Sequence, residues 1–487
     1  MEIVKDKMQS WLEIKPTSPR AIVIQRDEDL QIYFAKNKIW YIGDENELSE
    51  LYKQLGNQSQ TFWGGVPTAG LEIKKNHSGL PKLIVNTITN IVIDNYNGIE
   101  SKDTAKLDEW KNIAKDNNFD RLLWKALCET LYMGDGAIKL SNDSKISEYP
   151  IIEWYSGEKV DFVYKRGRLN EVVFKTFYNK ENRKYLLKER YGYGYVKYEL
   201  YDKDRLVNIN ELEETKGLED IFFDKKSIWA IPFMIDHNSK YEGRGASKFD
   251  GKYNSFDSLD EVISQWVEAV RLGKATKYIP EKLAPKDPET GMILTPNAYD
   301  NQFILTENDM QDGATSKIQV EQPDIPSDKY LQTYMTYLDL CLQGLISPST
   351  LGIDTKKIQD ANAQYERQME KTTMYTRQGI IEALTDFIPK VINTTLKMKK
   401  QLLKQPAGDD MKMEVKFSEY DSPSFDSQIE TIGKAKSNGI MSVETSIKEL
   451  YGDSKDEEWI KDEVKRVKEE QGIVDALEPA INEDLDL

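Results

Sequence analysis

The chain has 487 residues, of which 39% are hydrophobic and 31% charged, and its formal net charge is −17. The hydrophobic share is large enough for a folded core, so the composition excludes a chain that is disordered throughout, and the length allows roughly two to four domains. The two cysteines are too few for a disulfide framework or a four-thiolate zinc site, and the acidic balance argues against a protein that grips nucleic-acid phosphates with a basic face.

The N-terminal sequence MEIVKDKMQSWLEIKP lacks the continuous apolar core of a signal peptide. No run in the chain approaches the roughly 18 apolar residues of a membrane span. We therefore expect a soluble protein that is not exported and does not bind a membrane, and the scarcity of cysteine favours a reducing compartment.

The first 145 residues predict mainly helices with short strands between them. In NFDRLLWKALCETLYM, apolar residues such as Phe119, Leu123 and Leu127 recur at the spacing of one helix face. Gly134 and Gly136 then break the pattern, and AIKLS is predicted to be a strand. Further helical patterns occur in ENELSELYKQL, LPKLIVNTITNIVIDNYNGI and KLDEWKNIAKDN.

Residues Tyr149 to Phe233 change to an alternation rich in Tyr, Val and Phe. The segments KVDFVYKRGRLNEVVFKTFYN, KYLLKERYGYGYVKYELYD and SIWAIPFMID are bounded by turn sequences such as RGR and DKD. Alternation of this kind predicts an antiparallel meander.

Two amphipathic helices are predicted next, over 247–279 and 327–346. Pro280 and Pro285 are expected to end the first helix, since proline disfavours helix in the residue before it. The insertion between the helices holds three candidate strands, MILTP, QFILT and KIQVEQP. The side chains expected to pack in the helix pair are Phe256, Val262, Trp266, Val270, Leu331, Tyr334, Leu338 and Leu342.

The stretch ISPSTLGIDTKKIQDANAQYERQ follows, and it is longer and more polar than a simple helical connection needs. A helix of about 40 residues comes next, with a bend expected at Pro389. One strand, three short helices and an acidic tail complete the chain.

No catalytic, cofactor or metal site is predicted. The two histidines, His77 and His237, lie in turn-like sequences without a GxSxG elbow or a zinc pattern. The sequence EGRGAS at 242–247 lacks the complete phosphate-binding motifs and favours a tight turn. The chain has 83 acidic residues, so a catalytic carboxylate pair stays open as an alternative.

The order of these elements resembles the portal proteins of tailed bacteriophages, particularly the type found in long-tailed phages of Gram-positive hosts. The resemblance covers residues 80 to 470 and rests on the order of its motifs. They are LCETLYMGDGAIKL, PFMIDHNSKYEGRGASKFDGKYNSFDSLDEVISQWVEAVRLGKATKYIP, LISPSTLGIDTKKIQDANAQYERQMEKT and AKSNGIMSVETSIKELYGDSKDEE.

The resemblance implies an α+β portal subunit that has no enzymatic activity and needs no cofactor. Its parts would be a wing (1–246, β-rich over 146–235), two stem helices (247–279 and 327–346), a clip (280–326), a tunnel loop (347–363), a long kinked helix (364–404), a crown (405–472) and a mobile acidic tail (473–487).

The resemblance also implies partners and a location. Portal subunits form a ring, a dodecamer in the virion, at one capsid vertex, and double-stranded DNA passes through the ring. The implied partners are the terminase large subunit, a head-completion adaptor, and the major capsid and scaffolding proteins. Assembly in the host cytoplasm would precede residence in the virion.

Two groups of residues are expected to make functional contacts. In the tunnel loop, the residues nearest DNA would be Lys356, Lys357, Asp354, Asp360, Thr350 and Thr355. In the clip, the residues that meet the motor or adaptor would be Asp287, Glu289, Met292, Tyr299, Phe303 and Asp309.

Alternative interpretations remain open. The loop could be an ordinary exposed loop with two lysines, and the acidity could serve solubility alone. A baseplate or adaptor component of a phage could also combine long helices with β insertions. An intracellular hydrolase that uses a carboxylate pair is the third class.

Overall fold

The computed structural model describes residues 27–56, 60–66, 68, 72–181, 183–294, 303–306, 318–353, 363–405, 408–418, 432–451 and 457–470. It confirms the α+β class, with helices and mainly antiparallel strand pairs in one chain; β11 and β12, described below, pair parallel. The chain divides into two compact units, Met1–Ser418 and Glu419–Leu487.

The helical core of the first unit is built around α6. Its residues Phe119, Leu123, Leu127 and Leu131 are buried, as their spacing predicts, and α2 and α4 pack beside it. The helix α2 does not figure among the sequence predictions. The N-terminal helices are α2 (Asp27–Ile42), α3 (Glu45–Gln54), α4 (Leu80–Ile93), α5 (Thr104–Asp116) and α6 (Phe119–Met133).

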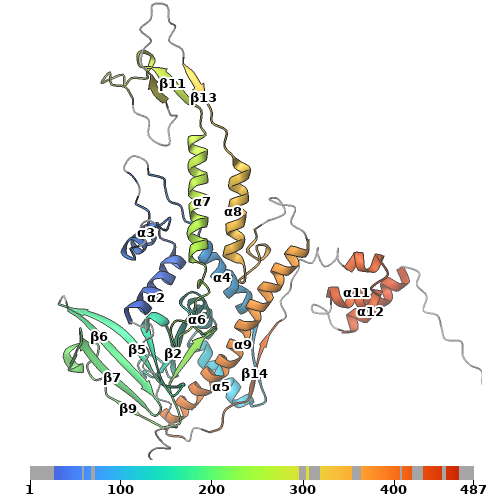
Figure 1. The fold of residues 1–487 in the computed structure, drawn as a ribbon. Coiled ribbons are helices and arrows are strands. Elements are labelled where there is room, and N and C mark those ends of the chain that lie inside the picture. Colours follow the sequence, from blue (N-terminus) through green and yellow to red (C-terminus); the bar gives the residue numbers. More distant parts are fainter. Residues whose placement is uncertain are drawn as a thin grey trace, which may run out of the picture. The chain divides into compact units, whose positions relative to one another are not determined.

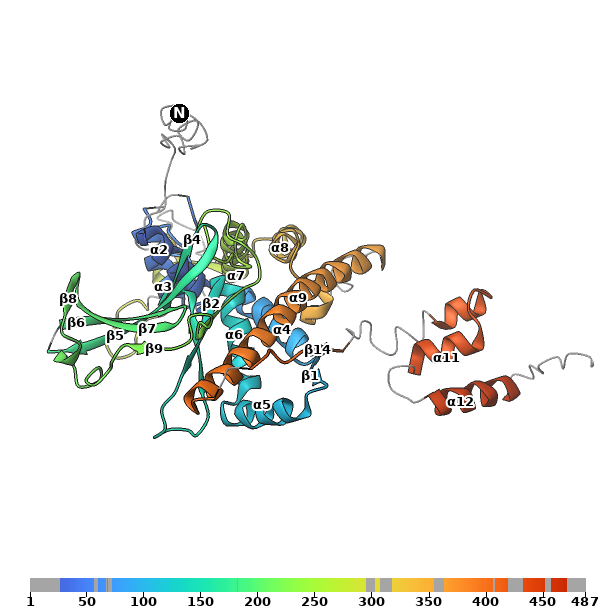
Figure 2. The same ribbon diagram turned by 90° about the horizontal axis from the view of Figure 1, so that it is seen from below.

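The β-rich region forms a six-stranded antiparallel sheet, whose neighbouring strands β5, β6 and β7 can be followed in Figure 2. In β6, Tyr185, Leu187 and Tyr191 alternate with more exposed residues, so one face of the sheet is buried. The strands are β4 (Val160–Lys165), β5 (Arg168–Lys180), β6 (Arg183–Gly192), β7 (Tyr195–Asp202), β8 (Arg205–Val207) and β9 (Ile221–Phe222), with the 3-10 turns η1 (Gly157–Lys159) and η2 (Ile209–Glu211) at its margins.

The segment SIWAIPFMID does not join this meander, which corrects the sequence prediction. Its strand β10 (Ala230–Met234) pairs with β2 (Asp135–Ser141), and β3 (Ile151–Ser156) lies on the other side of β2. Six of the seven residues of β2 are buried. A strand buried on both faces needs a partner at each edge, and β10 supplies the second one.

The strand predicted after the long helix belongs to the first unit, which ends at Ser418. This strand, β14 (Met413–Phe417), pairs antiparallel with β1 (Tyr96–Ser101), more than 300 residues earlier in the chain. The long helix α9 (Ala363–Leu402) contains Pro389 and packs one face into the core. Its buried residues include Ile380, Leu384, Phe387, Ile388, Val391, Ile392 and Leu396.

The second unit is a small helical body. A helix over 432–437 precedes α11 (Val443–Tyr451) and α12 (Glu457–Glu470). Ile447 and Val464 are buried, and the Tyr451 and Trp459 rings meet edge to face at 5.2 Å between centroids. None of the helices in the described ranges combines the length and the apolar character that crossing a bilayer requires.

Candidate functional site

Two long helices, α7 (Tyr253–Leu272) and α8 (Ser327–Leu342), lie side by side (Figure 1). The helix expected over 247–279 is shorter at both ends. Residues 247–252 form turns, in which Asp250 N donates to the Ser247 carbonyl. Beyond Gly273, the segment Thr276–Pro280 is the strand β11, because Pro280 disfavours helix in Ile279 and the strand finds two partners.

The base of this helix pair is buried. Phe256 and Leu259 of α7 and Leu338 and Leu342 of α8 are almost fully covered. The Lys252 ammonium donates to the Leu340 carbonyl at 2.8 Å and to the Gln343 carbonyl at 2.7 Å. A lysine at these free carbonyls stabilises the C-terminus of α8 and holds it against the start of α7.

The tip of the helix pair, residues 265–272 and 327–337, is more exposed than the base. Trp266 stacks on Tyr330 with 6.1 Å between ring centroids, and its ring lies 6.5 Å from that of Tyr334. Leu331 is half-buried, whereas Val270 is 52% exposed in the single chain. No side chain in 265–272 or 327–337 is buried. Several apolar residues at the tip, among them Val267, Val270 and Leu272, thus remain exposed.

Beyond the tip lies a three-stranded sheet in the order β12-β11-β13, formed by β12 (Phe303–Thr306), β11 and β13 (Gln319–Glu321). The predicted strands QFILT and KIQVEQP correspond to β12 and β13. MILTP forms no strand among the described residues, since Ile293 makes only an isolated bridge with Lys286. The 3-10 turn η3 (Glu281–Leu283) follows β11.

The expected clip residues are distributed over this region. Asp287 organises a turn, accepting hydrogen bonds from Glu289 N and Thr290 Oγ1, both at 2.9 Å. Met292 is 73% exposed, and Phe303 pairs with Lys277 across β12 and β11. The remaining two, Tyr299 and Asp309, lie outside the described residues.

The start of the expected tunnel loop is firmly held. Ile346 and Ser347 are fully buried, and Ser347 N donates to Thr373 Oγ1 of α9 at 2.8 Å. Thr350 lies in the 3-10 turn η4 (Ser349–Leu351), with its hydroxyl 2.6 Å from Ser347 Oγ. The other expected DNA-proximal residues, Asp354, Thr355, Lys356, Lys357 and Asp360, lie outside the described residues.

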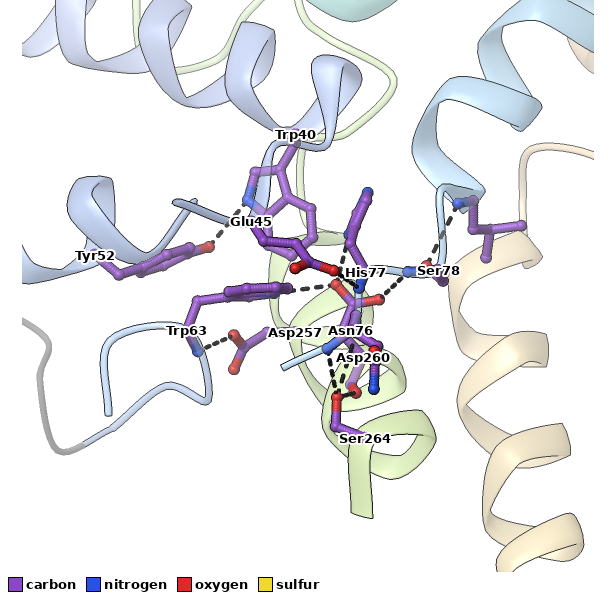
Figure 3. A network of polar contacts seen from close by, with 11 residues as sticks. Trp40, Glu45, Tyr52, Trp63, Asn76, His77, Ser78, Asp257, Asp260 and Ser264 are labelled. Atoms are coloured by element: carbon purple, nitrogen blue, oxygen red, sulfur yellow. Dashed lines mark hydrogen bonds and ion pairs between the residues drawn. The ribbon is translucent and has the colours of Figure 1, made fainter. Parts of the chain in front are cut away.

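Two carboxylates of α7 fasten the segment 60–79 to the base of the helix pair (Figure 3). Asp257 accepts hydrogen bonds from the backbone N–H groups of Phe62 (2.8 Å) and Trp63 (3.1 Å). Asp260 accepts from Trp63 Nε1 (3.0 Å), Ser78 N (2.8 Å) and His77 Nδ1 (2.7 Å). Burial raises the pKa of Asp257, and the two backbone donors oppose this rise.

His77 is enclosed rather than exposed in a simple turn. Because the Asp260 carboxylate accepts at Nδ1, that nitrogen carries a proton, and Nε2 is buried without a hydrogen-bond partner among the described atoms. The backbone of Gly43 closes over the ring, since a Cβ there would lie 2.8 Å from Nε2. This histidine is therefore placed to hold structure and has no open face toward a substrate.

Sequence reasoning missed this network. The available signal was two aspartates three residues apart beside Phe256 and Leu259, on the apolar side of a helix pattern. A charged residue on a buried stripe requires hydrogen-bond donors. Those donors come from residues about 180 to 200 positions away, which no local pattern indicates.

The EGRGAS segment forms a turn, and its arginine is buried. The Arg244 guanidinium donates to Asp135 Oδ1 and to the Val160 and Gly157 carbonyls, each at 2.8 Å. Gly245 N donates to the other Asp135 oxygen at 2.7 Å. Burial raises the pKa of Asp135, and Arg244 opposes this rise. The segment thus ties its turn to β2, and His237 lies at its edge in a bridge with Gly245.

Within the described ranges, no group of three or more His, Cys, Asp or Glu side chains is arranged to hold a metal ion. Cys128 and Cys341 are free and buried.

Comparisons with protein-family models and with curated proteins find no match. Among solved structures, a chain of the virion of a native gene transfer agent particle is similar, with a TM-score of 0.39 and 10% identity; the match covers 80% of this chain and 96% of that chain. A chain from the neck of the native gene transfer agent particle has a TM-score of 0.38 and 11% identity, covering 82% and 93%. Both TM-scores lie below 0.5, so the function proposed below rests on this chain's own residues and geometry.

Proposed function

We propose that this chain is a portal protein, which forms a ring at one capsid vertex and provides a channel for double-stranded DNA during packaging and ejection. The observation that carries the proposal is the α7–α8 pair, which is buried at its base and exposes apolar side chains at its tip. Val267, Val270 and Leu272 are 37%, 52% and 65% exposed. Exposed apolar surface of this kind marks a protein contact.

A closed ring accounts for this surface. Each subunit of a ring presents different faces to its two neighbours, so both sides of the helix pair become covered when the ring closes. Aromatic anchors such as Trp266 and Tyr330, stacked at the tip, supply rigid contact area.

Charge agrees with a conduit for DNA. Twelve copies at −17 each carry roughly −200, and a channel with this bias repels phosphates. DNA then passes without being gripped. Lys356 and Lys357 are the residues we assign to the closest approach to DNA, moderated by Asp354 and Asp360.

The remaining assignments follow from the order of the elements. The sheet β12-β11-β13 and its turns would contact the terminase large subunit during packaging and the head-completion adaptor afterwards. Capsid and scaffolding proteins would contact the outer parts of the ring. ATP hydrolysis would belong to the terminase, and this chain would act as a non-enzymatic platform in the virion.

Negative-stain images and mass photometry of the purified protein test the proposal. We expect rings with a central hole as wide as a DNA duplex, and a mass many times that of the 56.2 kDa chain. A baseplate or adaptor component would form either closed rings that lack such a channel or no rings at all. A strict monomer at every protein and salt concentration would contradict the portal assignment.

A further inference from the structure

A groove of about 600 Å³ lies between β1, α5 and the start of α6. Tyr96, Asn97, Gly98 and Ile99 of β1 line one side of it. None of its lining residues comes from β14, the strand that pairs with β1. The groove therefore lies on the side of β1 away from its partner.

The backbone of β1 is unpaired along this side. Within the described residues β1 belongs to a two-stranded sheet, so no strand occupies its second edge. The pairing with β14 also shifts between Tyr96 and Ile99, so Asn97 and Gly98 have no matched residue in the strand register, although the Asn97 side-chain amide donates to Ser418 Oγ at 2.6 Å. A Cβ built on Gly98 would meet nothing within 4 Å, so another backbone can approach closely there. A free strand edge of this kind accepts an added strand.

The floor of the groove is apolar and rigid. Trp110 and Phe119 are almost fully buried and meet edge to face, with 5.0 Å between ring centroids. Leu107 and Ala114 of α5 lie beside them and are half-buried. Since every second side chain of an extended peptide points the same way, a peptide along β1 would direct alternate side chains onto this floor.

The rim of the groove is basic, in contrast to the net charge of −17 for the whole chain. Lys111, Lys115 and Arg121 are exposed there, and Asp120 is the one acidic residue among the lining residues. Lys111 forms an exposed ion pair with Asp108 at 3.5 Å. No described carboxylate lies within ion-pair distance of Lys115 or Arg121.

We propose that this groove binds an extended acidic peptide of a partner protein, which adds as a strand to β1. The free edge provides the backbone hydrogen bonds, the apolar floor accepts alternate side chains, and the basic rim selects acidic residues. The inference does not depend on the portal assignment, because all the groups involved lie in one subunit.

Fluorescence anisotropy with the full-length protein tests the proposal. The probe is a short labelled peptide in which Glu alternates with Val; one control peptide has Lys in place of Glu, and another carries alternate N-methylated amides that cannot donate. We expect saturable binding of the Glu peptide and at least about tenfold weaker binding of both controls. Amide exchange at residues 96–99 should slow when the Glu peptide binds.

Two double variants locate the binding. Lys115→Gln with Arg121→Gln should weaken binding of the Glu peptide at least about tenfold, whereas Lys225→Gln with Lys226→Gln, which are exposed in the turn after β9 and do not line the groove, should leave it unchanged. Thermal unfolding checks that both variants fold. Absence of binding, or binding that is indifferent to N-methylation and to the rim variant, overturns the proposal. Mass photometry on the same samples reports ring assembly separately. If the peptide binds only to dissociated subunits, a second copy of the chain occupies the groove in the assembly. This outcome also overturns the proposal.

Discussion

Asp257 and Asp260 show how individual side chains fix the base of a long helix. Both are carboxylates on the buried side of α7, and together they accept five hydrogen bonds from the segment 60–79. Lys75 completes the arrangement by donating to the carbonyls of Phe62, Trp63 and Gly65 at 2.6, 2.9 and 3.1 Å. The two carboxylates therefore attach this segment to α7. Because their hydrogen bonds are satisfied, these charged residues are tolerated beside an apolar stripe.

Replacing Asp260 with Asn should destabilise the first unit by about 2–4 kcal/mol. The amide has one acceptor oxygen where the carboxylate has two, and its NH₂ group would face the donors Trp63 Nε1 and His77 Nδ1. Urea unfolding measures the loss, and amide exchange at Ser78 should become faster. Glu261→Gln, one residue further on α7, is the control and should stay within about 0.5 kcal/mol of the wild type. Equal stability of the two variants would contradict this account of the network.

Lys356 and Lys357 give a second prediction for single residues. Changing both to Ala should leave ring formation intact and alter DNA packaging or the retention of packaged DNA. Assembled particles would be assayed for protected DNA with nuclease and for DNA loss under heat. The matched control is Lys225→Ala with Lys226→Ala. Packaging and retention equal to the wild type would assign the two lysines to an ordinary exposed loop.

At the scale of elements, the α7–α8 pair has two halves with different roles. Lys252 and the buried apolar residues hold its base, while the tip is joined by the Trp266–Tyr330 stack. The base is thus held by contacts within this chain, whereas the tip, in the ring proposed above, would be covered by neighbouring subunits.

Trp266→Ala should loosen the tip and spare the base. Loss of the contacts to Tyr330 and Tyr334 should cost about 1–2 kcal/mol locally, because the indole is only partly buried. Amide exchange should accelerate about tenfold in 265–272 and 327–335. Exchange in 253–262 should not change, and acceleration there would show that the two halves unfold together.

Deleting Asp287 to Asp312 tests the role of the sheet beyond the tip. The deletion removes the Asp287 turn and β12 but leaves both helices, so rings should still form in mass photometry. Binding of the terminase large subunit and of the adaptor, measured by co-sedimentation, should be lost. Retained binding of both partners would exclude the clip assignment.

Local patterns predicted the elements better than their partners. The apolar spacing in Phe119 to Leu131 indicated α6, and the position of α8 agrees with its stripe. The predicted C-terminal end of α7 was wrong. TKYIP forms a strand instead, because it pairs with β12 and β13, which lie later in the chain. β10 was misplaced for the same reason, and the partner of β14 was not predicted, since β2 and β1 are distant in sequence. The His77–Asp260 contact likewise joins residues that local periodicity cannot connect.

For the whole molecule, the decisive question is what covers the exposed apolar residues at the tip. Val267→Asp with Val270→Asp should leave the subunit folded, because both valines are already exposed to solvent in the single chain. Ring formation should fail, since burying a carboxylate at a subunit contact costs several kcal/mol per site. Mass photometry and thermal unfolding together separate assembly from folding. Rings from this variant would place the subunit contact elsewhere.

The first residues after α8, Leu345 to Ser347, have a mechanical consequence. Leu345, Ile346 and Ser347 are buried, and the Ser347 amide is bonded to Thr373 of α9. A load applied at the far sheet and carried down α8 therefore has a rigid route into the core of the subunit, without slack at the helix end. Work done on the tip would therefore reach α9 through the hydrogen bond between Ser347 and Thr373.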